Sequence, residues 1–227
     1  MKKAEVHARI EEIGIIPAVR VSSAEDARFA AESVTRGGIP IVEITMTVPG
    51  ALEVISNLVK TNPEMTVGAG SILDIETARR CVDAGAQFLT TDGLVLNVVE
   101  FAVKERIVVF PGVLTPSEVI AAWGAGSDFV KVVPCAAVGG DSYIRSIKAP
   151  LPHVPLIAAG GVNQLTALNF ILSGATALGV GRELIPKEAI RLRQADRIVE
   201  LARRFLSFVN NGRVQAAARK ESIWSRP

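Results

Sequence analysis

Asp128-Phe129-Val130-Lys131-Val132-Val133-Pro134 is a short run of β-branched and aromatic residues that one lysine interrupts. Continuous apolar runs of this length are typical of strands buried on both faces, as in a parallel sheet covered by helices. The run therefore predicts a buried strand over 129–134, with a charged side chain inside it.

Similar segments recur on both sides of this run, and we expect the other strands at 14–21, 39–46, 66–71, 87–92, 108–113, 155–160 and 177–181. A helical pattern follows each strand, and glycines such as Gly85 and Gly126 stand where a left-handed helix end is needed. Eight strand–helix units after a short leading helix predict an α/β fold, a (β/α)₈ TIM barrel with a short N-terminal helix. A doubly wound open sheet is the competing architecture, but no Gly-x-Gly-x-x-Gly follows the first strand.

Length and composition fit one barrel domain over residues 1–210, because α/β barrels of about 200–250 residues form single domains. Of the 227 residues, 49% are hydrophobic and 5% aromatic, which predicts a core of Ala, Val, Leu and Ile. Residues 211–227 are small, polar and basic, and they predict a flexible C-terminal tail.

Several classes of function are disfavoured by the same numbers. A net charge of +2 argues against a nucleic-acid partner, and no apolar stretch reaches the roughly 18 residues that span a bilayer. The first 14 residues lack the apolar segment of a signal peptide, so we expect a cytoplasmic protein without a membrane partner. Cys81 and Cys135 make neither a disulfide framework nor a metal site, so they predict no bound metal. No cofactor is expected either.

Lys131 is the first candidate for chemistry. Lysine is rarely buried without a partner, and burial favours the neutral amine, which can attack a carbonyl and form a Schiff base. The alternative is a lysine near a strand end whose amine reaches solvent or pairs with an acid.

Glu43 lies inside the second predicted strand, among isoleucine and valine. A buried carboxylate either pairs with a cation or has a raised pKa that suits proton transfer, and we expect Glu43 and Lys131 to form a charge pair in the barrel. Arg20 ends the first predicted strand, where its planar guanidinium could bind a carboxylate through two hydrogen bonds. The alternative is an ordinary surface arginine.

Glycine clusters follow the last two strands, at Gly160-Gly161 and at Gly179-Val180-Gly181-Arg182. Loops at these places often bind phosphate in TIM barrels through backbone N–H groups. The two clusters predict an anion site to which Arg182 adds a charged hydrogen bond, although glycines also serve simply to tighten loops.

Five segments resemble the 2-keto-3-deoxy-6-phosphogluconate (KDPG) / 2-keto-4-hydroxyglutarate (KHG) aldolase family, in order and spacing: Val42-Glu43-Ile44-Thr45, Val67-Gly68-Ala69-Gly70-Ser71, Phe110-Pro111-Gly112-Val113, Val130-Lys131-Val132-Val133-Pro134 and Gly160-Gly161-Val162. The resemblance runs from about residue 13 to residue 186. It implies a metal-independent class I aldolase, a homotrimer, that acts on a small keto acid. It also implies that Lys131 forms the Schiff base and that Glu43 is the general acid/base.

The chain departs from the family pattern at several positions. Thr47 stands where many members carry an arginine for the pyruvate carboxylate, so this role is expected to pass to Arg20, assisted by Thr47 and by Ser71, where threonine is usual. Three further departures are expected around the distal end of the substrate: Asp92 for proline, Ala159 for threonine and Arg182 for serine.

The resemblance implies cleavage of a 2-keto-3-deoxy sugar acid to pyruvate and an aldehyde. The leading candidate substrate is KDPG, which gives glyceraldehyde 3-phosphate as the aldehyde. The alternatives are the same chemistry on 2-keto-3-deoxy-6-phosphogalactonate, 4-hydroxy-2-oxoglutarate or an unphosphorylated keto acid. An alternative from another functional class is a non-catalytic barrel that binds phosphosugars. Loss of Lys131 or Glu43 would have favoured this alternative, and both residues are present.

Overall fold

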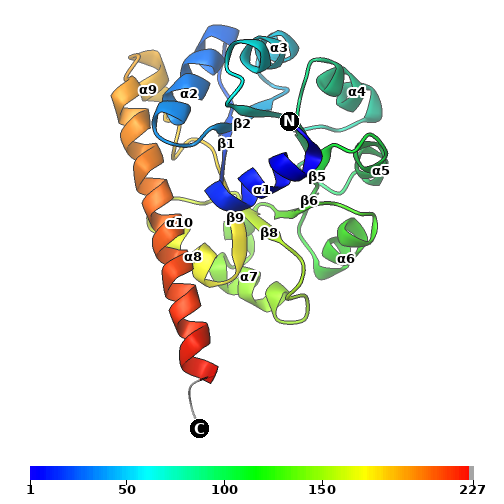
Figure 1. Cartoon of the computed structure of the whole chain (residues 1–227), viewed down its shortest axis with the longest axis vertical. Helices are drawn as coiled ribbons and strands as arrows, with labels where there is room; N and C mark the ends of the chain where they lie inside the picture. Colours follow the sequence, from blue (N-terminus) through cyan, green and yellow to red (C-terminus); the bar gives the residue numbers. More distant parts are fainter. Residues whose placement is uncertain (225–227) are drawn as a thin grey trace.

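The computed structural model describes residues 1–224 and the side chains of residues 1–219. Parallel strands alternate with helices along the chain (Figure 1). The strands are β1 (Ile15–Val19), β2 (Ile41–Thr45), β3 (Thr66–Gly70), β4 (Phe88–Thr90), β5 (Val108–Phe110), β6 (Gly112–Val113), β7 (Val130–Val132), β8 (Leu156–Ala159) and β9 (Ala175–Val180). The helices are α1 (Lys3–Ile13), α2 (Ala24–Arg36), α3 (Ala51–Thr61), α4 (Ile75–Asp83), α5 (Leu96–Lys104), α6 (Pro116–Gly124), α7 (Asp141–Lys148), α8 (Ala167–Leu172), α9 (Lys187–Arg191) and α10 (Ala195–Trp224), with a 3₁₀ turn over Cys135–Val138.

The strands form one parallel sheet in the order β5-β4-β3-β2-β1-β9-β8-β7-β6. Its two end strands, β5 and β6, are the halves of one predicted strand that Pro111 divides. Proline has no N–H to give to a sheet, but the Pro111 carbonyl accepts a bond from the Lys131 N–H at 2.9 Å. The chain itself thus closes the ring, and the predicted TIM-barrel architecture is confirmed.

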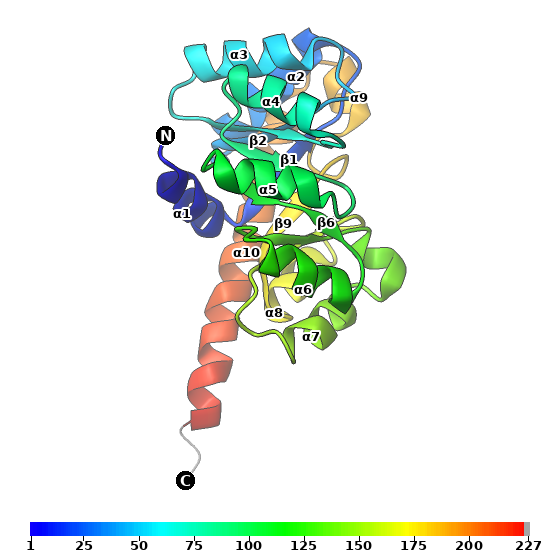
Figure 2. The same cartoon turned by 90° about the vertical axis from the view of Figure 1, so that its right-hand side faces the viewer.

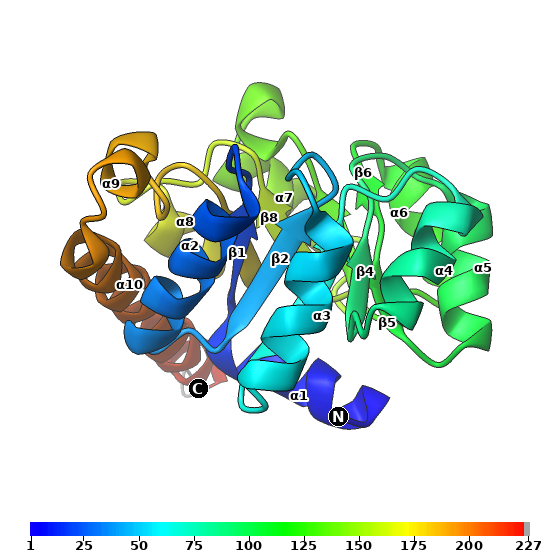
Figure 3. The same cartoon turned by 90° about the horizontal axis from the view of Figure 1, so that it is seen from above.

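Helix α1 covers the amino-terminal mouth of the barrel (Figures 1 and 3). Its apolar face buries Val6 and Ile10, and the His7 ring stacks on Phe129 at 4.5 Å between centroids. Lys3 adds an ion pair to Asp128, with 3.0 Å between Nζ and Oδ2.

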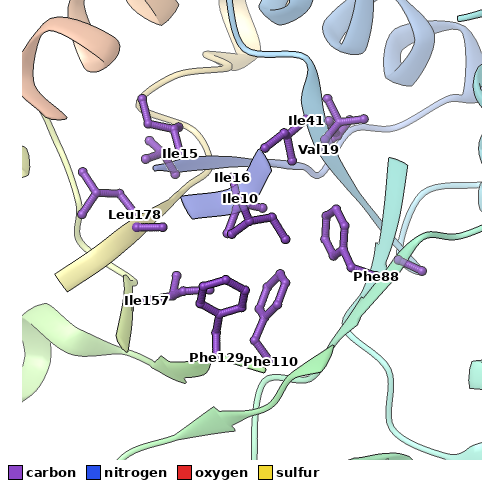
Figure 4. Close-up of a cluster of buried hydrophobic side chains, with 14 of the residues drawn as sticks. Ile10, Ile15, Ile16, Val19, Ile41, Phe88, Phe110, Phe129, Ile157 and Leu178 are labelled. Carbon is purple, nitrogen blue, oxygen red and sulfur yellow. The ribbon is translucent and has the colours of Figure 1, made fainter. Parts of the chain in front are cut away.

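Inside the barrel, Ile10 meets a layer of aromatic and branched side chains (Figure 4). The rings of Phe88 and Phe110 stack with 5.2 Å between centroids, and Phe129 meets Phe110 edge-on at 6.3 Å. Burial of apolar surface is the main favourable term in folding. This layer therefore closes the amino-terminal end and leaves the carboxyl ends of the strands for polar groups.

Helix α10 corrects the prediction of a flexible tail that begins at residue 211. It continues as one helix to Trp224 and projects past the barrel, and only residues 225–227 of the predicted tail lie outside the described part (Figure 2). The sequence-based prediction rested on the small, polar and basic composition of residues 211–227, which favours a loose chain end. Tertiary contacts override this preference, because Gly212 packs on Ile171. In the described part of the chain, no helix is long and apolar enough to cross a membrane.

Candidate active site

The candidate residues come from different strands, and most of them lie at or just after the carboxyl ends of those strands. Lys131 lies in β7, Glu43 in β2 and Ala159 at the end of β8. The others follow a strand directly or by two residues, as Arg20 follows β1 and Ser71 follows β3. In TIM barrels this end carries the chemistry.

Lys131 is buried, with 5% of its surface exposed, and its amine has one close carboxylate partner among the described residues. Its Nζ donates a hydrogen bond to Asp92 Oδ1 at 2.9 Å, and the two groups form an ion pair. The predicted charge pair between Lys131 and Glu43 is therefore wrong as a direct contact. The Asp92 carboxylate is half-exposed, so it keeps its charge at a smaller desolvation cost than a fully buried glutamate.

Two further predicted residues converge on Asp92 Oδ2. The Ser71 hydroxyl donates a hydrogen bond to it, and Arg20 Nη2 lies 3.8 Å away. Burial pushes the pKa of Asp92 up, but the charge of Lys131, the bonds from Ser71 and Lys131, and Arg20 outweigh it and leave the pKa below its usual value. Asp92 is therefore an ionised carboxylate that is surrounded by the donor groups of Lys131, Ser71 and Arg20.

Asp92 was expected near the distal end of the substrate, and the structure places it on the Lys131 amine instead. The loop that carries it is fixed by Thr91, whose hydroxyl accepts from the Gly112 N–H at 3.0 Å and donates to the Gly93 carbonyl at 2.5 Å. A Cβ at Gly112 would come within 2.5 Å of the Asp92 carbonyl carbon, so glycine is required for this approach. The sequence signal was available, since an acidic residue directly after a barrel strand points to the active-site mouth.

Glu43 is buried to 5% exposure beside Gly70. A Cβ at Gly70 would lie 2.3 Å from Glu43 Oε1, so the missing side chain makes the space for this carboxylate. Burial raises the pKa of Glu43 above its usual 4.5; the charges of Lys131 and Arg20 oppose this effect and that of Asp92 adds to it. Within residues 1–219, no ion pair or hydrogen bond engages the Glu43 carboxylate.

The charge of Lys131 thus acts on two carboxylates that are in opposite states. Asp92 is held ionised, while Glu43 is driven towards its neutral form. Pairs of acids whose pKa values are pushed apart are a mark of acid/base sites. The arrangement can hold a substrate anion near Lys131 and move a proton at Glu43.

Thr47 lies outside this group of contacts. Its hydroxyl shares a hydrogen bond of 2.8 Å with Thr45, which also donates to the Val19 carbonyl at 3.0 Å. No hydrogen bond in the described part joins Thr47 to Arg20 or Asp92.

The predicted distal residues lie after β8 and β9. Gly160 and Gly161 have φ of 78° and 88°, and a Cβ at either would approach Pro134 or Ala136 too closely. Both glycines are thus explained by packing alone, and the buried Ala159 precedes them. Gly181 directly follows β9, and anion binding by this loop stays a prediction.

Arg182 is exposed, directly after Gly181. In the part of the chain with described side chains, it makes no ion pair. Pairing with Glu188 would have removed it from a substrate role, but Glu188 is instead engaged by Arg191 at 3.6 Å and Arg197 at 3.8 Å. The guanidinium of Arg182 remains available to a ligand.

Comparison with known proteins agrees with the barrel fold and identifies the family of the chain. The model of the KDPG and KHG aldolase family matches residues 6–201. The KHG/KDPG aldolase of Escherichia coli K12 is 30% identical over 190 residues, which cover 83% of this chain and 89% of that protein. The 2-dehydro-3-deoxy-phosphogluconate aldolase of Pseudomonas aeruginosa is 26% identical over 189 residues, with 83% and 86% covered.

Solved structures give the same result. KDPG aldolase from Legionella pneumophila, with pyruvate captured at low pH as a covalent carbinolamine intermediate, superimposes with a TM-score of 0.81 at 29% identity and covers 87% of this chain and 96% of that one. The KDPG aldolase of Zymomonas mobilis ZM4 shares the fold, with a TM-score of 0.82 at 24% identity, over 91% of this chain and 97% of that one.

Fold and matches together define an aldolase built on a parallel α/β barrel, a carbon–carbon lyase. The chain belongs to the KDPG and KHG aldolase family of class I aldolases.

Proposed function

We propose that this protein cleaves 2-keto-3-deoxy-6-phosphogluconate to pyruvate and glyceraldehyde 3-phosphate through a Schiff base on Lys131. The observation that carries the proposal is a buried amine at the barrel mouth that is paired with the ionised Asp92, together with the buried Glu43, whose raised pKa favours its neutral form and responds to the charge of Lys131. The pyruvate carbinolamine captured in the Legionella relative supports it, because this adduct precedes an imine.

In the proposed reaction, the Lys131 amine attacks the C2 ketone and water leaves, which gives an iminium. The iminium accepts the electrons of the C3–C4 bond as it breaks, so no metal or organic cofactor is needed. Glu43 takes the proton of the C4 hydroxyl as the aldehyde departs. It then returns a proton as the enamine becomes pyruvate, and water releases Lys131.

The raised pKa of Glu43 supports this role. A general acid/base works best when its pKa lies near the working pH, since it must both accept and donate. An exposed glutamate with a usual pKa of 4.5 holds its proton poorly at neutral pH, and burial in β2 corrects this. The space beside Gly70 keeps the carboxylate in place without a hydrogen-bond partner that would fix its charge.

Arg20 and Ser71 are proposed to bind the carboxylate of the keto acid, with the Thr47 hydroxyl as a further donor. Gly160, Gly161, Gly181 and Arg182 are proposed to bind the distal anion, a phosphate in KDPG. A distal carboxylate, as in 4-hydroxy-2-oxoglutarate, suits the same guanidinium, and one relative carries both substrate names.

One assay tests the choice of substrate. Pyruvate release is measured for KDPG, 2-keto-3-deoxy-6-phosphogalactonate, 4-hydroxy-2-oxoglutarate and the unphosphorylated acid. We expect the highest kcat/KM with KDPG. A higher value with one of the others reassigns the substrate within the family, and no pyruvate from any of them contradicts the proposed function.

Arg182→Ser separates phosphate binding from loop support in the same assay. A charged hydrogen bond of about 1.5–3 kcal/mol corresponds to a rise of roughly ten- to hundredfold in KM for KDPG, with a much smaller effect on the unphosphorylated acid. Equal losses on both substrates would instead assign Arg182 to loop support.

The homotrimer that the resemblance implies is also proposed, and light scattering tests it. The expected mass is three times the 24.1 kDa of one chain. The expected cytoplasmic location stays a prediction.

A further inference from the structure

The three groups that hold the Asp92 carboxylate are the same three that the proposed function assigns to the keto-acid end of the substrate. Lys131 lies 2.9 Å from Oδ1, the Ser71 hydroxyl donates to Oδ2, and Arg20 lies 3.8 Å from Oδ2. Asp92 therefore has the surroundings expected of a bound carboxylate.

This placement is built into the barrel. Thr91 ties the loop to Gly93 and to the Gly112 N–H, and Gly112 leaves room for the loop backbone. The side chain of Asp92 is 45% exposed, so it can rotate outward while its backbone stays fixed.

Two carboxylates do not share these donors readily, because like charges in contact repel each other. We propose that the Asp92 carboxylate occupies the place of the substrate carboxylate in the ligand-free protein, and that the keto acid displaces it on binding. This role rests on the proposed function, and it makes Asp92 a specificity-determining residue.

Two consequences follow for binding. Asp92 keeps Lys131 and Arg20 close together before the substrate arrives, and it opposes small monoanions that could otherwise settle between them. It also raises the concentration of keto acid needed to reach Lys131. A carbonyl compound of the same shape without a charge does not compete with Asp92 for Arg20.

The experiment compares pyruvate with its neutral amide, pyruvamide, in the whole protein. Sodium cyanoborohydride traps the imine, and the half-saturating concentration is read from the Lys131 adduct by mass spectrometry. In Asp92→Asn, we expect the value for pyruvate to fall by about tenfold, because one like-charge contact is lost. The value for pyruvamide should change by less than about twofold, since the lost repulsion acts on charge.

Asp83→Asn is the matched control, since it removes an exposed aspartate at the end of α4, away from the carboxyl ends of the strands. Asp92→Ser tests whether the effect is peculiar to asparagine. This variant should also lower the half-saturating concentration of pyruvate. Acetate should inhibit adduct formation at a lower concentration in Asp92→Asn than in the unmodified protein.

An unchanged or raised half-saturating concentration of pyruvate in Asp92→Asn would overturn the proposal. Equal shifts for pyruvate and pyruvamide would also overturn it, because Asp92 would then act on the amine and not on the carboxylate place. Loss of folded structure in both variants would assign Asp92 a structural role. If the unmodified protein forms no Lys131 adduct, the proposed function itself fails, a result distinct from all of these.

Discussion

At the scale of single residues, the difference between Asp92 and Glu43 is the main electrostatic feature of the site. Both carboxylates feel Lys131, yet burial dominates at Glu43 and raises its pKa, while charge and hydrogen bonds prevail at Asp92 and lower it. The sequence predicted Lys131 and Glu43 as the functional pair because each is a charge inside an apolar strand. It did not predict that Asp92, in a loop, is the partner of the amine, since strand patterns say nothing of how loops fold back.

Glu43→Gln tests the proton-transfer role. The variant keeps the shape of the side chain but cannot carry the proton, so we expect aldol cleavage to fall by about a hundredfold or more while imine trapping on Lys131 is largely retained. Single-turnover cleavage and cyanoborohydride trapping measure the two steps separately. Near-normal turnover would reduce Glu43 to a structural residue.

The same variant has a predicted pH-dependent effect on stability. Because the folded pKa of Glu43 is raised, the unfolded chain releases this proton first as pH rises above 4.5, and ionisation then favours unfolding. Glu43→Gln lacks this penalty, so its advantage in Tm over the unmodified protein should grow as the pH rises from 4.5 towards neutral.

Differential scanning calorimetry across this range measures the gap in Tm. Glu53→Gln, on the exposed side of α3, controls for the loss of one negative charge. A gap that shrinks with rising pH would mean that Glu43 is stabilised in its charged form.

At the scale of elements, the position of every strand could be predicted from the apolar runs and from the glycines at helix ends. The reason is that a parallel strand buried on both faces leaves a clear sequence pattern. The division of 108–113 into β5 and β6 followed from Pro111, which a pattern of hydrophobicity does not register. Helix α10 was cut short in the prediction because its continuation depends on contacts far away in the sequence.

Arg213 is the clearest of these contacts. From α10 it donates to the Glu12 carbonyl at 2.5 Å, to the Glu11 carbonyl, and to the Thr176 carbonyl at 3.3 Å. It thereby joins α10 to the end of α1 and to β9.

Arg213→Ala should lower the free energy of unfolding by about 1–3 kcal/mol, because it removes charged hydrogen bonds at a half-buried place. Urea titration measures the change, with Arg203→Ala as the control, an exposed arginine on the same helix. Equal and small effects of the two variants would show that the last turns of α10 contribute little to the barrel.

At the scale of the whole molecule, the barrel separates stability from chemistry. Helix α1 and the aromatic layer around Phe110 close the amino-terminal mouth (Figures 1 and 4), while Lys131, Asp92, Ser71 and Arg20 meet at the other. This division is typical of TIM barrels. It explains why the fold could be predicted from repeats, whereas the site required the positions of the three loops after β1, β3 and β4 relative to Lys131 in β7.

The central claim is that Lys131 is the residue that forms the imine. The most direct measurement is mass spectrometry of the digested protein after incubation with pyruvate and cyanoborohydride. The account predicts one adduct, on the peptide that contains Lys131, and its loss together with all cleavage activity in Lys131→Ala. An unmodified Lys131 peptide, with activity retained in Lys131→Ala, would contradict it.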